Sequence, residues 1–139
     1  MRQAHDTLTV QTRSPGLVDI THQTETFVAK SGIRDGLLTA FIRHTSASLV
    51  VQENADPDVL SDLEAFMRRT VSRDTKLYDH TTEGPDDMPA HIRSALTQTS
   101  LAIPVRGGRL VLGTWQAIYV WEHRDRGHAR EIALHIIGE

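Results

Sequence analysis

The sequence predicts an α+β domain built on a largely antiparallel β-sheet or sandwich with a few covering helices. Several alternating or β-branched runs are typical of strands, and three other segments have helical spacing. These elements do not follow a βαβ order, and the sequence contains no internal repeat, which argues against a Rossmann fold or a barrel. The 139 residues suffice for one hydrophobic core but not for two, so we expect a single domain over residues 1–139.

The first strand and the first helix are expected near the N-terminus. Apolar and polar residues alternate from Thr7 to Gln11, and the turn Ser14-Pro15-Gly16 ends this predicted strand. Four residues of the next segment fall on one helical stripe: Ile20, Thr24, Phe27 and Val28. The stripe predicts a helix between an N-cap at Asp19 and a terminal glycine at Gly32.

The middle of the chain predicts a long β segment and then a helix. Residues 36–53 are rich in β-branched and apolar side chains, but the run is too long for one average strand. We therefore expect a bend or bulge near its midpoint, where His44 lies. Asp56-Pro57 then supplies an N-cap and a proline at the first helical position, and apolar residues follow at helical spacing as far as Val71.

A long polar loop and a short helix follow. Residues 72–88 contain Gly84-Pro85 and show no sustained period, and loops of this length often carry function. Pro89 is expected to open the helix. Three of its apolar residues are expected to face the core: Ile92, Ala95 and Leu96. The loop thus presents His80, and the helix presents His91 on a different edge.

The remainder predicts β-structure. Residues 101–105 and 109–122 flank Gly107-Gly108, which predicts a hairpin because both glycines reach positive φ at little cost. A charged turn over residues 123–127 separates this hairpin from a last strand over residues 129–137.

Composition excludes several classes of protein. The longest apolar runs are far too short to span a membrane, and the N-terminus has no apolar signal region, so we expect a cytoplasmic protein. The formal charge of −3 argues against a broad nucleic-acid surface. Because the chain has no cysteine, a transition metal can bind only through imidazole and carboxylate groups.

The histidines differ in their surroundings. His80 and His91 bracket Glu83, Asp86 and Asp87, which places two imidazoles and three carboxylates within twelve residues. This set suits a metal, but no HExxH or comparable spacing occurs, so a solvated acidic loop is an equal alternative. A row of small hydroxyl side chains suited to ligand oxygens follows His44: Thr45, Ser46 and Ser48. Four further histidines have no supporting cluster: His5, His22, His128 and His135.

The strand expected around Trp115 carries two polar residues on one face, Gln116 and Glu122, and aromatic residues on the other. In a regular strand Gln116 and Glu122 are roughly 20 Å apart, at about 3.3 Å per residue. One small ligand cannot contact both. Either a bulge brings them together or they serve different places, including a site completed by a neighbouring subunit. The aromatic face is itself typical of core or of a subunit interface.

Five phrases resemble the YjbQ family, in the family's order and over nearly the whole chain. They are His44-Thr-Ser-Ala-Ser-Leu49, Gln52-Glu-Asn-Ala-Asp-Pro57, Glu83-Gly-Pro-Asp-Asp-Met-Pro-Ala-His-Ile92, Gly113-Thr-Trp-Gln116 and Glu122-His-Arg124. The family is also labelled secondary thiamine-phosphate synthase. The resemblance implies a compact, β-rich α+β subunit that assembles as a homotrimer, and a weak thiamine-phosphate synthase activity.

The implied reaction joins a hydroxymethylpyrimidine pyrophosphate to a thiazole phosphate and expels pyrophosphate. As the C–O bond breaks, the pyrimidine methylene becomes cationic and the leaving group gathers negative charge. Catalysis would therefore rest on positioning and preorganised electrostatics. A divalent ion such as Mg²⁺ suits the pyrophosphate.

The resemblance also implies a set of site residues. The expected catalytic residues are Glu122, Arg124, Asn54 and Gln116. The expected substrate-binding residues, which would contact phosphate oxygens, are Ser46, Thr114 and again Arg124. The expected ligands of one metal such as Zn²⁺ are His44, His80 and His91. Structural roles are alternatives for some of them: Asn54 as the cap of a turn, and Glu122 with Arg124 as a surface ion pair.

Three functions remain open at this stage, all with a small-molecule ligand. The first is thiamine-phosphate synthesis, although the dedicated synthases resemble TIM barrels, which this chain is too short to form. The second is metal-dependent hydrolysis of a phosphorylated or heterocyclic metabolite. The third is a trimer that binds a metabolite or metal without turnover. The first two make the protein an enzyme, which is the interpretation we favour.

Overall fold

Two antiparallel sheets form the centre of the protein in a computed structural model, which describes residues 1–139. The five-stranded sheet has the order β1 (Arg2–Gln11), β8 (Ala129–Gly138), β3 (Gly36–Ile42), β5 (Ser100–Arg106) and β6 (Arg109–Leu110). The three-stranded sheet has the order β2 (Gly16–Asp19), β7 (Gln116–Glu122) and β4 (Ala47–Glu53). Every strand pairing is antiparallel, which confirms the predicted α+β class and its antiparallel sheets.

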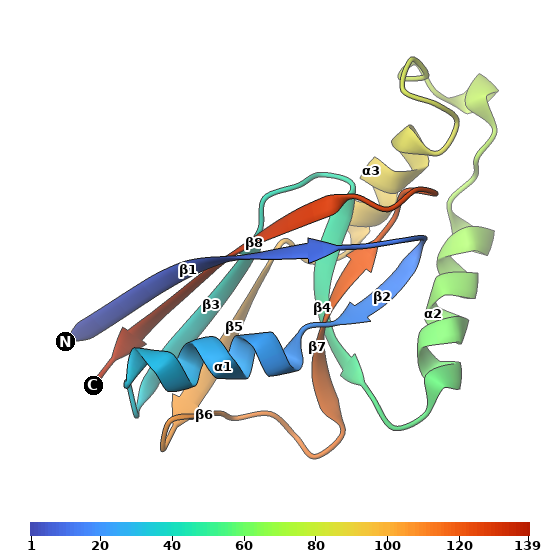
Figure 1. Cartoon of the computed structure of the whole chain (residues 1–139). Coiled ribbons are helices and arrows are strands. Elements are labelled where there is room, and N and C mark those ends of the chain that lie inside the picture. Colours follow the sequence, from blue (N-terminus) through green and yellow to red (C-terminus); the bar gives the residue numbers. More distant parts are fainter.

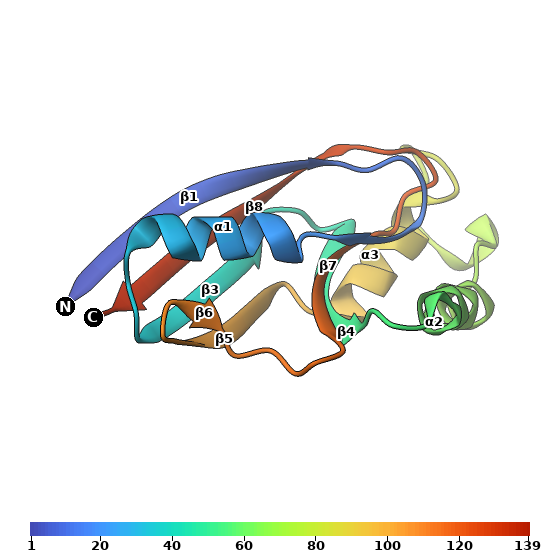
Figure 2. The ribbon, with the colours of Figure 1, turned by 60° about the horizontal axis from the view of Figure 1, so that its bottom comes forward.

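The helices lie at different ends of the molecule. Helix α1 (Thr21–Ser31) lies along the five-stranded sheet, whereas α2 (Pro57–Thr70) and α3 (Asp87–Leu96) lie at the opposite end, beside the three-stranded sheet (Figures 1 and 2). A 3₁₀ turn, η1 (Thr75–Leu77), interrupts the polar loop before α3. None of the helices combines the length and the apolar character that crossing a membrane would require.

The N-terminal prediction is confirmed apart from the helix cap. Strand β1 is longer than the alternating segment that predicted it, and it pairs with β8 along its whole length. Gly32 ends α1 with a φ of 70°, as predicted. The N-cap is Ile20 rather than Asp19, but the Asp19 carboxylate accepts a hydrogen bond from the backbone nitrogen of Thr21 at 2.8 Å. Asp19 therefore still satisfies a free amide of the first turn.

The long β segment over residues 36–53 is two strands in different sheets and not one bent strand. Its first part, β3, belongs to the five-stranded sheet, and its second part, β4, belongs to the three-stranded sheet. Leu38 and Ile42 from β3 and Leu49 from β4 all lie in the same main core. The crossing lets both halves bury their apolar side chains in one place. His44 lies in the link between the strands.

The prediction for α2 is confirmed. The Asp56 carboxylate accepts a hydrogen bond from the backbone nitrogen of Asp58 at 2.9 Å, and Pro57 occupies the first turn. Met67 and Val71 pack against Trp121 of β7 on the outer face of the three-stranded sheet. The aromatic face of β7 is therefore buried under α2, while its other face enters the main core.

Helix α3 differs from the prediction in its start and in part of its buried face. It begins at Asp87, two residues before Pro89. Ile92 packs against the cluster around Trp121, as predicted. Leu96 is 62% exposed, and Ala95 is exposed as well, so the prediction was wrong for these two. The buried Arg93 adds an ion pair to the apolar contact, because its Nη1 lies 2.9 Å from Glu64 Oε2 of α2.

The predicted hairpin at Gly107-Gly108 is confirmed, but the strand expected over residues 109–122 is interrupted. Strand β6 has two residues, and the chain then runs without strand pairing until β7 begins at Gln116 in the other sheet. Trp115 lies in this interruption and is 62% exposed. Residues of the segment 108–116 and of α1 line one pocket.

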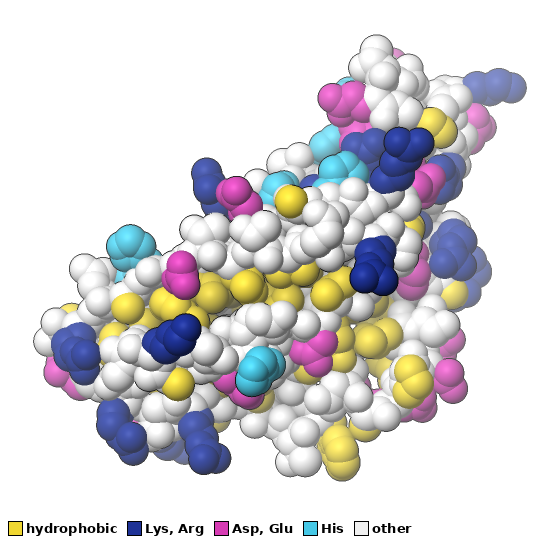
Figure 3. Space-filling view, viewed as in Figure 1, with side chains coloured by type: hydrophobic (Ala, Val, Ile, Leu, Met, Phe, Trp, Pro, Cys, Tyr) yellow, Lys and Arg dark blue, Asp and Glu magenta, His cyan; other side chains and the backbone are white.

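The five-stranded sheet is not fully covered on its helical side. A band of hydrophobic side chains is visible between β1 and α1 in the space-filling view (Figure 3). The apolar residues that line this groove are Ala4, Leu8, Phe27 and Leu134.

Candidate functional site

Four side chains from one segment converge beside α3. His80 and Glu83 come from the loop, Asp87 opens the helix, and His91 follows one turn later. Asp87 Oδ2 lies 2.7 Å from His80 Nε2 and 3.0 Å from His91 Nε2, and Glu83 Oε2 lies 3.5 Å from His80 Nε2. The four ligand atoms all lie within 4.8 Å of one another. Histidine and acidic side chains gather at this end of the molecule in Figure 3.

The contacts of His91 identify which ring nitrogen donates to the backbone. His91 Nδ1 lies 2.8 Å from the carbonyl oxygen of Thr45, which can only accept, so this nitrogen carries a proton. In a neutral ring, His91 Nε2 then presents a lone pair to the Asp87 carboxylate oxygen. His91 Nε2 and Asp87 Oδ2 lie 3.0 Å apart, and two lone pairs at this distance repel each other. A cation must therefore lie between them, either a proton on Nε2 or a metal. A histidine that donates its other N–H to a backbone carbonyl is the common arrangement of a metal ligand.

The geometry of the cluster fits a small cation. The ligand atoms of a tetrahedral site with bonds of about 2.0–2.1 Å lie roughly 3.3 Å apart. The two contacts of His80 and the contact of His91 with Asp87, at 2.7, 3.5 and 3.0 Å, lie on either side of this value. The hydrogen bond with Asp87 raises the pKa of His80, since the carboxylate stabilises the protonated ring. A metal would replace that proton.

Arg124 clamps the two aspartates of the segment. Its Nη1 lies 2.9 Å from Asp87 Oδ1, its Nε donates to Asp86 Oδ2 at 2.9 Å, and its Nη2 donates to the Glu83 carbonyl oxygen at 3.1 Å. Partial burial would raise the pKa of the Asp86 carboxyl, but the hydrogen bonds from Arg124 and from the Asp125 backbone lower it to about 2. Asp87 thus turns Oδ1 to Arg124 and Oδ2 to the two histidines.

Arg124 therefore has different contacts from those that either prediction expected. The sequence predicted that its guanidinium binds substrate phosphate, and the alternative was a surface ion pair with Glu122. In the structure its donors are engaged by the segment over residues 83–87, so it positions a candidate metal ligand. The alternative was wrong as well, because Glu122 is fully buried and pairs with Arg130.

His44 does not join the other two predicted metal ligands. Its Nε2 accepts a hydrogen bond from the backbone nitrogen of Glu131 at 2.8 Å, and its Nδ1 faces Arg130 Nη1 at 3.4 Å. Burial and then the charge of Arg130 lower the pKa of His44. Its Nε2 lone pair is thus already engaged, and carboxylates from residues 83 and 87 complete the cluster in its place.

Glu122 is the centre of a buried network that joins three parts of the chain. Its carboxylate accepts hydrogen bonds from Arg130 and from Thr12 Oγ1, the latter at 2.5 Å, and from the backbone nitrogens of His123 and Arg124 at 3.1 Å. Burial alone would raise the pKa of Glu122, but hydrogen bonds from Arg130 and Thr12 hold it below its ordinary value. No face of this carboxylate is open to a ligand, so the structure gives it a structural position.

An open pocket of ≈ 670 Å³ lies beside the cluster and shares His91 with it. His44 and Ser46, two predicted site residues, also line it. Hydroxyl groups predominate among its polar residues: Thr45, Ser46, Ser94 and Thr99. Ser46 Oγ accepts a hydrogen bond from Arg130 Nη2 at 3.0 Å, so it belongs to both the buried network and the pocket.

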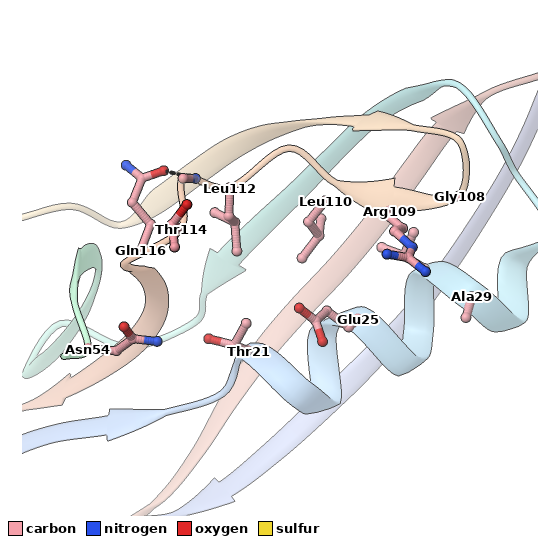
Figure 4. A pocket seen from close by; sticks show the side chains of 12 residues that line it. Thr21, Glu25, Ala29, Asn54, Gly108, Arg109, Leu110, Leu112, Thr114 and Gln116 are labelled. Atoms are coloured by element: carbon pink, nitrogen blue, oxygen red, sulfur yellow. Dashed lines mark hydrogen bonds between the residues drawn. The ribbon is translucent and has the colours of Figure 1, made fainter.

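The remaining predicted site residues lie near the start of β7, at the end of the strand away from Glu122. Asn54, Thr114 and Gln116 line a second pocket of ≈ 590 Å³ between α1 and the segment 108–116 (Figure 4). The pairing of β7 with β4 is continuous, so no bulge brings Gln116 to Glu122. These two residues therefore lie in different places, which was the second of the two alternatives. Asn54 makes no side-chain hydrogen bond in the structure, so it caps no turn.

Sequence reasoning missed two kinds of residue. The candidate ligands Glu83 and Asp87 were singled out only as carboxylates between two histidines. The i, i+4 spacing of Asp87 and His91 was the available signal. Arg130 was missed altogether. Its pairing with Glu122 depends on how β7 and β8 approach each other at the charged turn, and no local pattern records that approach.

The sequence matches the profile of a family described as "UPF0047 protein YjbQ-like" over residues 6–139. It is 53% identical over 138 residues to a UPF0047 protein of Synechocystis, with 99% of this chain and 94% of that protein covered. It is 44% identical over 134 residues to the UPF0047 protein YjbQ of Escherichia coli O157:H7, with 96% of both chains covered.

Solved structures show the same fold. A YbjQ-like protein of unknown function from Sulfolobus solfataricus superposes with a TM-score of 0.86 at 29% identity, with 99% of both chains covered. A conserved hypothetical protein from Thermus thermophilus superposes with a TM-score of 0.85 at 32% identity, with 95% of this chain and 99% of that one covered.

We predict that Arg130→Met lowers the free energy of unfolding by about 3–5 kcal/mol, because it leaves the Glu122 carboxylate buried without its partner. Urea denaturation measures the change. The matched control is Arg43→Met, which removes an ion pair with Glu131 whose side chains are 59% and 46% exposed, and should cost less than about 1 kcal/mol. Equal losses in the two variants would contradict the structural role of the buried pair.

Proposed function

The chain belongs to the YjbQ-like UPF0047 family, and we propose that it is a metal-dependent hydrolase of a phosphorylated or heterocyclic metabolite. In this proposal one divalent cation is held by His80, Glu83, Asp87 and His91. The observation that carries it is the contact of His91 Nε2 with the Asp87 carboxylate at 3.0 Å, while Nδ1 of the same ring donates to a backbone carbonyl. That pairing leaves a place for a cation between the two side chains.

The donor set favours a particular group of metals. Two imidazole nitrogens and two carboxylate oxygens suit Zn²⁺ or another first-row transition ion, whereas Mg²⁺ prefers oxygen ligands and retains waters. Asp87 is almost fully buried and is oriented by Arg124, which supports it as the fixed ligand. Glu83, whose side chain is 62% exposed, is the ligand that can move aside to open a position for water or substrate.

The hydroxyl-lined pocket beside His91 supports a hydrolytic function. A substrate bound there would lie against the cluster, with the Thr45 and Thr99 hydroxyls available as donors to its phosphoryl or carbonyl oxygens. A divalent cation in such a position lowers the pKa of water and polarises the oxygen of the bond to be cleaved. The protein supplies orientation through Arg124 and the Thr45 carbonyl.

We predict that the chelator-treated protein binds about one Zn²⁺ per chain in isothermal titration calorimetry. His80→Ala and His91→Ala should each weaken binding more than about 100-fold, because each removes a ligand. Arg124→Gln should weaken it about 10- to 100-fold, because it removes the side chain that orients Asp87. His22→Ala, at an exposed histidine outside the cluster, is the matched control and should leave binding unchanged.

The functional test compares hydrolysis of a panel of phosphomonoesters by the Zn²⁺-loaded protein and by the chelated protein. Turnover that depends on the metal and disappears in His91→Ala supports the proposal. Zinc binding without any metal-dependent turnover contradicts hydrolysis of phosphorylated metabolites and favours the metabolite- or metal-binding protein. Binding that survives loss of both His80 and His91 contradicts the metal centre itself.

Thiamine-phosphate synthesis is the second candidate function. The observation that favours it is the pair of carboxylates from Glu83 and Asp87, since oxygen ligands suit an Mg²⁺ ion that enters with a pyrophosphate substrate. Arg124 takes part only indirectly, because its donors are engaged by Asp86 and Asp87.

If the protein is such a synthase, it forms thiamine phosphate from hydroxymethylpyrimidine pyrophosphate and thiazole phosphate when Mg²⁺ is present. Asp87→Asn should then lower the rate at least about tenfold by removing a charge at the metal. Chromatographic detection of the product over hours measures this slow reaction, with Asp125→Asn as the control. The candidate is refuted if the unmodified protein forms no product above the uncatalysed background.

The homotrimer implied by the family resemblance is also a proposal for this chain. The outer face of the five-stranded sheet supports self-association, because Leu37, Phe41 and Ile137 are between 37% and 46% exposed there. Leu37 lies opposite Ile137 in the pairing of β3 with β8, so two of these side chains are cross-strand neighbours.

We predict that light scattering after size-exclusion chromatography gives three times the chain mass. Phe41→Glu should reduce that mass, since a charge on the apolar face opposes its burial. Phe66→Glu changes a similarly exposed phenylalanine on α2 and should leave the mass unchanged. A monomeric unmodified chain would exclude the trimer.

A further inference from the structure

The pocket between α1 and the segment 108–116 has the size and lining of a small-molecule site. Its volume of ≈ 590 Å³ falls within the range of about 300–1,000 Å³ that is usual for ligand pockets. Thr21 and Glu25 of α1 form one wall, and Arg109, Leu110 and Leu112 form the other (Figure 4). The pocket lies at the end of β7 away from the metal cluster and shares no residue with the pocket beside His91.

Hydrogen bonds fix both ends of the segment that forms the upper wall. At one end, the Gly108 backbone nitrogen donates to the Arg34 carbonyl oxygen at 2.8 Å. At the other end, the Gly113 backbone nitrogen donates to Gln116 Oε1 at 2.7 Å, and the Asn54 backbone nitrogen donates to the Trp115 carbonyl oxygen at 2.9 Å. The pocket is therefore formed before any ligand arrives, which limits the entropy that binding would cost.

Two opposite charges face this pocket without pairing. Figure 4 shows Glu25 directed from α1 and Arg109 directed from β6 toward the space between the two walls. No ion pair or side-chain hydrogen bond joins either of them to another residue of the chain. Both side chains are exposed, and both line this one cavity.

The rest of the lining is amphipathic. Leu110 and Leu112 are half-buried and pack against the main core, and Val28 of α1 is buried, so the pocket has an apolar floor. The Asn54 side chain lies at the far end with neither its donors nor its acceptor engaged (Figure 4). A ligand that fits would carry two charges at one end and an apolar body.

We propose that this pocket binds a small zwitterion of the apolar α-amino acid type. The ligand's ammonium group pairs with Glu25, its carboxylate pairs with Arg109, and its apolar side chain lies on Leu110 and Leu112. A molecule with only one of the two charges makes only one of the two ion pairs, so it binds more weakly. The site is independent of the proposed metal centre.

Nuclear magnetic resonance titration tests the proposal with L-leucine and L-phenylalanine as probes, and with N-acetyl-L-leucine and L-leucinamide as singly charged analogues. The amino acids should shift the amide signals of Gly108, Gly113 and Gln116 saturably, and the two analogues should bind at least about tenfold more weakly. Glu25→Gln and Arg109→Gln should each weaken binding of the amino acids at least about fivefold. Both positions are exposed, so the variants are expected to fold.

Two control variants separate this site from the rest of the protein. Arg106→Gln removes an exposed arginine of β5 outside the pocket, and His91→Ala disables the metal cluster; neither should change amino-acid binding. Absence of saturable shifts with either amino acid overturns the proposal. It is overturned equally if the analogues bind as well as the amino acids, or if Glu25→Gln and Arg109→Gln have no effect.

Discussion

The buried ion pair between Glu122 and Arg130 is the interaction on which the candidate metal site depends. Burying both charges is costly, and the network offsets that cost by satisfying every oxygen of the carboxylate. Two of its donors are the backbone nitrogens of His123 and Arg124, so the pair fixes the chain at the end of β7. Arg124 leaves the strand from that fixed point and reaches the aspartates of the α3 segment.

Much of the fold was predictable because its signals are local. The Asp56-Pro57 start of α2, the Gly32 end of α1 and the Gly107-Gly108 hairpin each depend on the conformations that a few neighbouring residues can adopt. The division of residues 36–53 between two sheets has no such signal. A β-branched run marks a strand but not its partners, and only the shared core explains why the chain crosses from β3 to β4.

The candidate site was predictable in part for the same reason. His80 and His91 were singled out by their acidic surroundings, and the structure brings them together with two of those carboxylates. The contacts of His44, Glu122 and Arg124 were not predicted, because their partners lie on other elements of the fold. Arg130 lies beside His44 and pairs with Glu122, and its position follows from the approach of strand ends rather than from any residue pattern. The separation of Gln116 from Glu122 was predictable, because it follows from the rise per residue of a regular strand.

The four side chains of the metal cluster span only twelve residues, from His80 to His91. Bringing them together closes a short loop, so the chain loses little entropy in assembling the site. A bound cation would then stabilise mainly this segment against local unfolding, by about RT ln(1 + [L]/Kd). Binding would increase the order of the chain between η1 and α3, while the two sheets keep the stability that their own core provides.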